Sequence, residues 1–187
     1  GHYGLGPFAV QLGLAAIRQI DVVALAAETL TRLRDETDCA VYLSLWGDRG
    51  PCIVARAEGT LQGAFAVRLG YVLPLTSTAT GLVFMAWLAE TETDEALKMQ
   101  AAYDAARKAG PGLTKREIAE AVARVRQRSF ASTSGRLHRN FAGLSAPIFD
   151  YGHRLAAALT LLGPTDFMTE ARQEEFATRL LEASQGL

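Results

Sequence analysis

The stretch "GLSAPIFDYGHRLAAALTLLG", Gly143 to Gly163, decides how this chain folds. It contains two apolar runs of strand length, 143–149 and 155–163. The residues between them, "DYGH" at 150–153, include aspartate and glycine, which favour tight turns. A connection this short joins strands that run antiparallel. The sequence therefore predicts an antiparallel hairpin near the C-terminus.

A second hairpin is predicted nearer the N-terminus. In "AVYLSLW", 40–46, Val41, Leu43 and Leu45 alternate with Tyr42, Ser44 and Trp46, which is the pattern of a half-buried strand. The residues "GDRGP", 47–51, supply the turn, and "CIVARA", 52–57, is the partner strand. Further strand-like segments are expected at about 64–69 and 71–75.

Helical patterns surround these hairpins. Asp21 is a suitable N-cap for a second helix, and Thr114 with Glu117 forms the pattern of a capping box. In the second helix one face is expected to carry Val22, Leu25, Ala26, Leu30 and Leu33. The predicted helices lie at 5–20, 21–36, 78–89, 93–109, 114–128 and 169–184. Strands grouped in hairpins, rather than alternating with helices, indicate an α+β fold in one domain.

Composition and charge restrict the function. The 187 residues include 19 basic and 20 acidic side chains, so the net charge of −1 gives no basic excess for gripping nucleic acid. The longest apolar runs fall short of a membrane span, and no secretory leader is evident, so we expect a cytoplasmic protein. The three histidines and two cysteines show no metal-ligand spacing. Gly1 and His2 have the form of a tag remnant.

The segment "PLTSTATGLVFMAWLA", Pro74 to Ala89, is the candidate binding motif. Small hydroxyl residues and a glycine lie where a strand-like run leads into a helix. If the helix begins here, the amides of Thr78, Ala79 and Thr80 are unpaired donors that attract a carboxylate or phosphate. The alternative is that Ser77 or Thr78 simply caps the helix and nothing binds.

Four blocks in order give the chain a family resemblance. These are "YGLGPFAVQLG" (3–13), the 74–88 segment, "VRQRSFA" (125–131) and the hairpin "GLSAPIFDYGHRLAAALTLLGP" (143–164). Together they resemble the C-terminal effector-binding domain of bacterial transcriptional regulators of the IclR type. The resemblance covers the chain from its first residues to its last.

That resemblance implies a GAF-like (profilin-like) fold, in which helices flank a curved antiparallel sheet. It implies a linker helix at 1–20, leading from a winged helix-turn-helix domain expected to precede Tyr3, and an effector-binding domain at 21–187. DNA would be bound only through the preceding domain. The expected partners are a small organic acid and further copies of the chain, as a homodimer or a dimer of dimers. No cofactor, metal or membrane is implied.

The resemblance also implies which residues hold the effector. Its carboxylate would meet the amides of Ala79 and Thr80, beside Thr78. The other implied positions are Phe65, Leu73, Thr133, Phe141, Gly143, Thr160 and Leu162. Thr160 and Leu162 share one strand face because they are two residues apart. The family's acidic pair near Thr133–Gly135 is missing, and Gly143 replaces a small polar side chain. Both departures favour a bulkier, less polar acid, such as an aromatic one.

The sequence leaves two other functions to consider. An enzyme would need Ser77, Thr78, Cys39 or Cys52 as nucleophile and His138 or His153 as base, but the sequence contains no Gly-x-Ser-x-Gly elbow. We therefore expect no catalysis. A GAF-like domain that only dimerises, without a ligand, is the second alternative.

Overall fold

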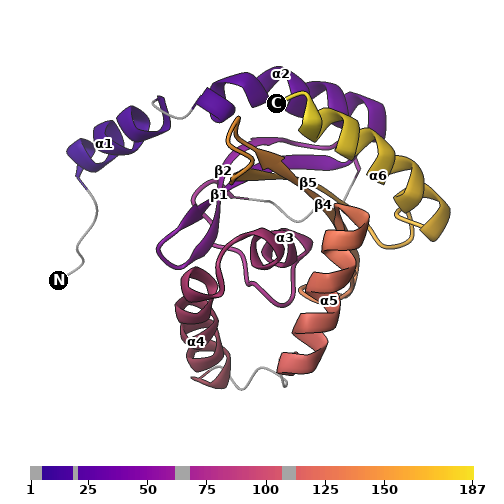
Figure 1. Ribbon diagram of the computed structural model, residues 1–187. Helices are drawn as coiled ribbons and strands as arrows, with labels where there is room; N and C mark the ends of the chain where they lie inside the picture. Colours follow the sequence, from indigo (N-terminus) through magenta and orange to yellow (C-terminus); the bar gives the residue numbers. More distant parts are fainter. Residues whose placement is uncertain (1–5, 19–20, 62–67, 107–112) are drawn as a thin grey trace.

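The computed structural model describes residues 6–18, 21–61, 68–106 and 113–187 (Figure 1). The helices are α1 (Pro7–Arg18), α2 (Asp21–Thr37), α3 (Ala79–Trp87), α4 (Glu90–Ala106), α5 (Lys115–Arg128) and α6 (Glu170–Gln185). The strands are β1 (Ala40–Gly47), β2 (Gly50–Ala57), β3 (Ala131–Ser134), β4 (Phe141–Phe149) and β5 (Leu155–Pro164).

The strands form one five-stranded antiparallel sheet in the order β2-β1-β5-β4-β3. Both predicted hairpins, β1–β2 and β4–β5, are confirmed. In the β4–β5 turn, Asp150 Oδ1 accepts from the amides of Gly152 at 2.8 Å and Arg154 at 2.9 Å. These backbone contacts, with the Arg154 guanidinium, hold the pKa of Asp150 below its usual range. The turn is therefore built by the residue that the sequence pattern identified.

Helices cover both faces of the sheet, which confirms the α+β, GAF-like architecture. Figure 1 shows α2 and α6 on one face and α3, with α4 and α5 beyond it, on the other. Alternation sorts the strand residues: Val41 and Leu43 of β1 are fully buried in the core beneath α2 and α6. Tyr42, on the opposite face, packs with Ile53 and Leu73. The second core forms around α3, whose Val83 and Phe84 are buried.

Three details depart from, or lie beyond, the sequence predictions. Leu25 was placed on the buried face of α2 but is 60% exposed, because the buried stripe runs through Ala26, Leu30 and Leu33. The strand expected at 64–69 falls mostly on 62–67, outside the described residues, and Leu69 lies in a turn. Within 71–75 only Val72 forms a bridge, to Cys52 of β2.

Helix α1 extends away from the sheet (Figure 1), with Phe8, Val10, Leu12 and Leu14 more than half exposed. The expected boundary between a linker at 1–20 and a domain at 21–187 corresponds to the junction of α1 and α2. That division stays a prediction. In the described part of the chain, no helix is both long and apolar enough to cross a membrane.

The capping box of α5 gives a stability prediction. Thr114 Oγ1 accepts from the Glu117 amide, while Glu117 Oε2 accepts from the Thr114 amide at 2.8 Å. We expect Thr114→Ala to lower the free energy of unfolding by about 1 kcal/mol, because it leaves helix-start amides without their cap. The measurement is urea denaturation followed by circular dichroism.

The matched control is Thr169→Ala. Thr169 is the N-cap residue of α6, but its side chain makes no capping hydrogen bond. The same substitution there should therefore cost much less. An equal loss in both variants would contradict the role given to the Thr114 cap.

Candidate functional site

The start of α3 combines a helix cap with open amide donors. Thr78 is the N-cap: its hydroxyl accepts from the Gly81 amide at 3.0 Å and donates to the Pro74 carbonyl at 2.7 Å. The helix therefore begins at Ala79, and no described residue accepts a hydrogen bond from the amide of Ala79 or Thr80. Of the two capping residues that the sequence suggested, Ser77 and Thr78, the cap is Thr78, and it leaves these two donors at the helix start open.

The loop before α3 is held firmly in place. A Cβ atom on Gly81 would lie closer than 3.0 Å to the Leu75 backbone, so only glycine lets the loop pack this close to the helix. On the other side, Gln100 of α4 accepts from the Leu75 amide at 2.7 Å and donates to Thr76 Oγ1 at 3.0 Å. These contacts fix the position of the amides at the start of α3.

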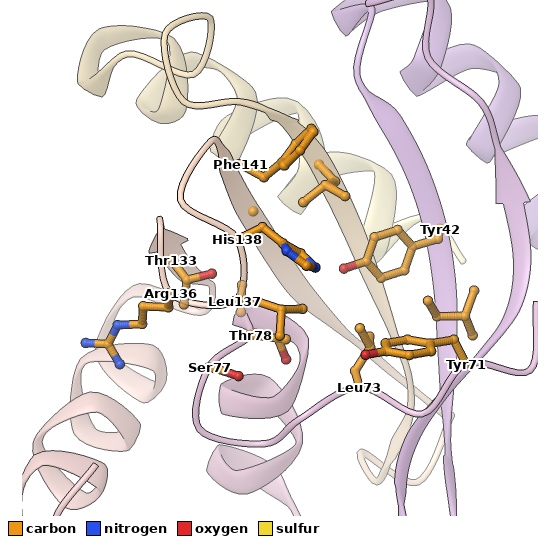
Figure 2. Close-up of a pocket in the computed structure, with 14 residues that line it drawn as sticks. Tyr42, Tyr71, Leu73, Ser77, Thr78, Thr133, Arg136, Leu137, His138 and Phe141 are labelled. Atoms are coloured by element: carbon orange, nitrogen blue, oxygen red, sulfur yellow. The ribbon is translucent and has the colours of Figure 1, made fainter. Parts of the chain in front are cut away.

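A partly open pocket adjoins this helix start (Figure 2). It lies between the α3-facing side of the sheet, the segment before α3 and the loop between β3 and β4. Its lining consists of Tyr42, Ile53, Tyr71, Leu73, Ser77, Thr78, Ala79, Thr133, Arg136, Leu137, His138, Phe141, Gly143 and Leu162. Most of these side chains are apolar or aromatic, as in typical small-molecule sites.

The sequence-predicted site residues mostly meet at this pocket. The lining includes Leu73, Thr78, Ala79, Thr133, Phe141, Gly143 and Leu162. They come together because Gly143 of β4 pairs with Leu162 of β5 on one side and Thr133 of β3 on the other. The side chains of Thr80 and Thr160 do not belong to the lining. Phe65 lies outside the described residues.

Thr80 and Thr160 form a chain of buried hydroxyls behind the pocket wall. Tyr42 Oη lies 3.3 Å from Thr80 Oγ1, and Thr80 Oγ1 lies 2.9 Å from Thr160 Oγ1. Thr160 then donates to Ser145 Oγ at 2.9 Å. Burial raises the pKa of Tyr42 to about 12, although its hydrogen-bonded neighbours oppose the shift. Tyr42 is therefore a neutral phenol at pH 7, and its oxygen projects into the pocket (Figure 2).

Several lining residues were not predicted as effector contacts. They are Tyr42, Ile53, Tyr71, Ser77, Arg136, Leu137 and His138. The alternation in β1 does predict which sheet face carries Tyr42. It does not predict that Tyr42 lies opposite Thr160, because that register joins strands far apart in the sequence. The β3–β4 loop carries no motif for a binding wall.

The pocket lining is electrostatically suited to an anion. Arg136 lies at the rim, where its Nη1 donates to the Thr76 carbonyl at 3.5 Å, and Figure 2 shows His138 projecting toward Tyr42. No aspartate or glutamate is among the described lining residues. A carboxylate entering here would meet amide donors, with no acidic side chain in the described lining to repel it.

The candidate nucleophiles form no recognisable catalytic set. Cys39 is completely buried, which raises its pKa to about 11, and burial also raises the pKa of Cys52. Neither thiol lines the pocket. Ser77 and His138 do line it, but its described lining includes no carboxylate to orient the imidazole. Among the described residues there is also no cluster that could hold a metal ion.

Comparison with known proteins identifies the family. The model for "Bacterial transcriptional regulator IclR C-terminal" matches residues 14–187. The HTH-type transcriptional regulator XynR of Escherichia coli K12 is 28% identical over 100% of this chain and 73% of its own length. The Transcriptional repressor IclR of the same organism is 23% identical over 98% of this chain and 67% of its own length.

Solved structures agree. The crystal structure of Pseudomonas aeruginosa HmgR is 34% identical, with a TM-score of 0.79 over 99% of this chain and 72% of that one. The Thermotoga maritima IclR structure, at 22% identity, shares the fold with a TM-score of 0.81 over 96% of this chain and 72% of that one. The two Escherichia coli relatives are named as a transcriptional regulator and a transcriptional repressor. The chain belongs to the IclR family of bacterial transcriptional regulators, of which it is the C-terminal effector domain.

Proposed function

We propose that the pocket binds a small organic acid with a bulky apolar body, such as an aromatic ring. The carboxylate would accept hydrogen bonds from the amides of Ala79 and Thr80. The observation that carries this proposal is the pocket itself, which adjoins open amide donors and has no acidic residue in its described lining. Such donors at a helix start favour a negative charge.

The rest of the lining favours the apolar body. Tyr71 and Phe141 offer aromatic surface, and Leu73 and Leu162 offer aliphatic surface. Gly143 leaves room in the pocket wall, because even a Cβ atom at this position would have no neighbour closer than 3.6 Å. A short keto acid would leave much of this apolar surface without contacts, whereas a ring would fill it.

Binding would regulate DNA recognition by a domain that precedes this chain. The relatives are regulators of transcription, and this chain, with a net charge of −1, has no basic excess of its own. Regulation of this kind requires two conformations of the regulator that differ in DNA recognition. A ligand shifts the balance between them only if it binds one conformation more tightly than the other. The exposed apolar residues of α1 favour assembly with further copies, as a homodimer or a dimer of dimers.

Calorimetric titration with benzoate, phenylacetate, pyruvate and glyoxylate tests the proposal. We expect the ring acids to bind more tightly than the keto acids, because only they fill the apolar lining. A ligand at a hundred times its dissociation constant should add about 2.7 kcal/mol to the free energy of unfolding. Tighter binding of pyruvate or glyoxylate than of either ring acid would contradict the proposed ligand class.

A pocket-filling variant shows where the acid binds. Gly143→Val should be tolerated in β4, because the new Cβ meets its neighbours at ordinary contact distances. Its methyl groups would occupy the pocket, so the heat of binding should disappear while the melting temperature of the free protein is kept. Unchanged binding in this variant would place the acid elsewhere. A flat response to every acid would favour a domain that only self-associates.

A further inference from the structure

The chain of hydroxyls behind the pocket has a direction. Each hydroxyl has one proton to donate, and Thr160 donates its proton to Ser145. In its 2.9 Å contact with Thr80, Thr160 can therefore only accept. Thr80 gives its proton to Thr160, and so it must accept from Tyr42 across 3.3 Å.

This direction determines what Tyr42 offers to a ligand. Its one proton is used inside the protein, so the lone pairs that remain on Oη can only accept. Tyr42 is 4% exposed, and its oxygen projects into the pocket in Figure 2. Inside the protein this hydroxyl contacts the hydroxyls of Thr80, at 3.3 Å, and Thr160. A buried acceptor that a ligand leaves without a donor weakens binding.

We propose that the pocket selects a hydroxy acid, whose hydroxyl group donates to Tyr42 Oη while its carboxylate binds at the start of α3. The proposal rests on the proposed function and narrows its ligand class. A keto oxygen at the same place has no proton to donate, so its lone pairs would face the lone pairs of Tyr42 Oη and no hydrogen bond would form. Tyr42, oriented by Thr80, Thr160 and Ser145, is thus a specificity-determining residue.

The geometry also indicates where the ligand hydroxyl lies. Tyr42 Oη is 3.3 Å from the side chain of Thr80, the residue whose amide belongs to the proposed carboxylate site. The donor and the carboxylate must therefore be close together in the ligand, as they are in a 2-hydroxy acid.

Three probes of almost equal size test this selection. Mandelate has a hydroxyl beside its carboxylate, phenylacetate has neither hydroxyl nor ketone there, and phenylglyoxylate has a ketone. By isothermal titration calorimetry at pH 7 we expect mandelate to bind about three- to tenfold more tightly than phenylacetate, which corresponds to one net hydrogen bond. Phenylglyoxylate should bind more weakly than phenylacetate.

Two variants test whether the hydroxyl chain is the cause. Tyr42→Phe removes the acceptor, so mandelate and phenylacetate should then bind within about twofold of each other. Thr160→Val removes the group that takes the proton of Thr80. Thr80 can then donate to Tyr42, which frees the Tyr42 proton for the ligand. Phenylglyoxylate should therefore gain affinity in Thr160→Val, whereas phenylacetate should not.

The matched control is Ser44→Ala. Ser44 is a completely buried hydroxyl two residues from Tyr42 on β1, with no hydrogen-bond partner among the described residues. Its removal should leave the order of the three probes unchanged. This variant separates the hydroxyl chain from any general effect of deleting a buried oxygen on this strand.

The outcomes separate this inference from the proposed function. If all three probes bind the wild type equally, or if Tyr42→Phe keeps the preference for mandelate, the inference is overturned and acid binding stands. If none of the probes binds, the acid-binding function fails and the inference fails with it. Preference for mandelate that disappears in Tyr42→Phe and survives in Ser44→Ala supports it.

Discussion

Replacement of Ala79 by proline is expected to weaken binding of phenylacetate by about 10- to 100-fold, with little change in the stability of the fold. Proline has no amide hydrogen, so the variant loses one of the two proposed donors to the carboxylate, and a hydrogen bond to a charged group is worth about 1.5–3 kcal/mol. The proline ring also occupies space where the carboxylate would lie.

The backbone at this position accepts proline. Ala79 is the first residue of α3, a position where proline is common because the amide has no partner within the helix. Thr78, which precedes it, has φ −123° and ψ 148°, within the range that a residue before proline adopts. The substitution therefore tests the amide donor rather than the helix.

The matched control is Lys115→Pro, at the first position of α5. There the preceding residue, Thr114, has φ −67° and ψ 159°, and the site lies outside the pocket lining. Calorimetry should give wild-type affinity for phenylacetate in this variant. Equal affinity in Ala79→Pro and Lys115→Pro would show that the Ala79 amide does not hold the acid.

Gly81→Ala is expected to give the largest loss of stability, about 3 kcal/mol or more in the free energy of unfolding. The added Cβ would lie closer than 3.0 Å to the backbone of Leu75, which cannot rotate away as a flexible side chain could. Gln100 holds the same residue from the other side, through its 2.7 Å contact with the Leu75 amide. The start of α3 must therefore shift, and we expect acid binding to be lost as well. Urea denaturation measures the first effect.

Gly143→Ala is the control for this variant, because it adds the same methyl group at a buried glycine of the same site. The nearest atom to the new Cβ would be the Leu161 carbonyl oxygen at 3.6 Å, which is ordinary contact. Its unfolding free energy should stay within about 1 kcal/mol of the wild type. If the two variants were equally stable, the close approach of the loop to α3 would not be the constraint inferred here.

The sequence alone determined the features that depend on neighbours along the chain. Asp150 forms the β4–β5 turn through amides within four residues of itself, and Thr114 caps α5 through Glu117, three residues away. Thr78 caps α3 in the same local way, through Gly81. Turns and helix caps are formed by a few consecutive residues, so the β4–β5 turn and the starts of α3 and α5 could be predicted from the sequence. The two predicted hairpins then indicated an antiparallel sheet and the α+β class.

Local patterns were less reliable where burial depends on partners. The stripe on α2 was predicted with Leu25 in it, but the packing of α2 buries Ala26 instead. Strand β3 was not predicted as a strand, because four residues are too few to show a period and its partner is β4. In both cases the deciding contact comes from a distant part of the chain.

Only the tertiary structure decided how the pocket is built. The family resemblance assigned Thr160 and the amide of Thr80 to the pocket. The side chains of both residues lie behind its wall, and Tyr42 projects into it. These positions depend on the strand register, which places Tyr42 beside Thr160 and Thr160 beside Ser145. Tyr42 and Thr160 are more than a hundred residues apart in the sequence. A strand's alternation fixes which side chains share a face, but not which residue of another strand lies opposite. Register is set by the packing of the whole sheet between its two helical layers, and no local stretch of sequence contains it.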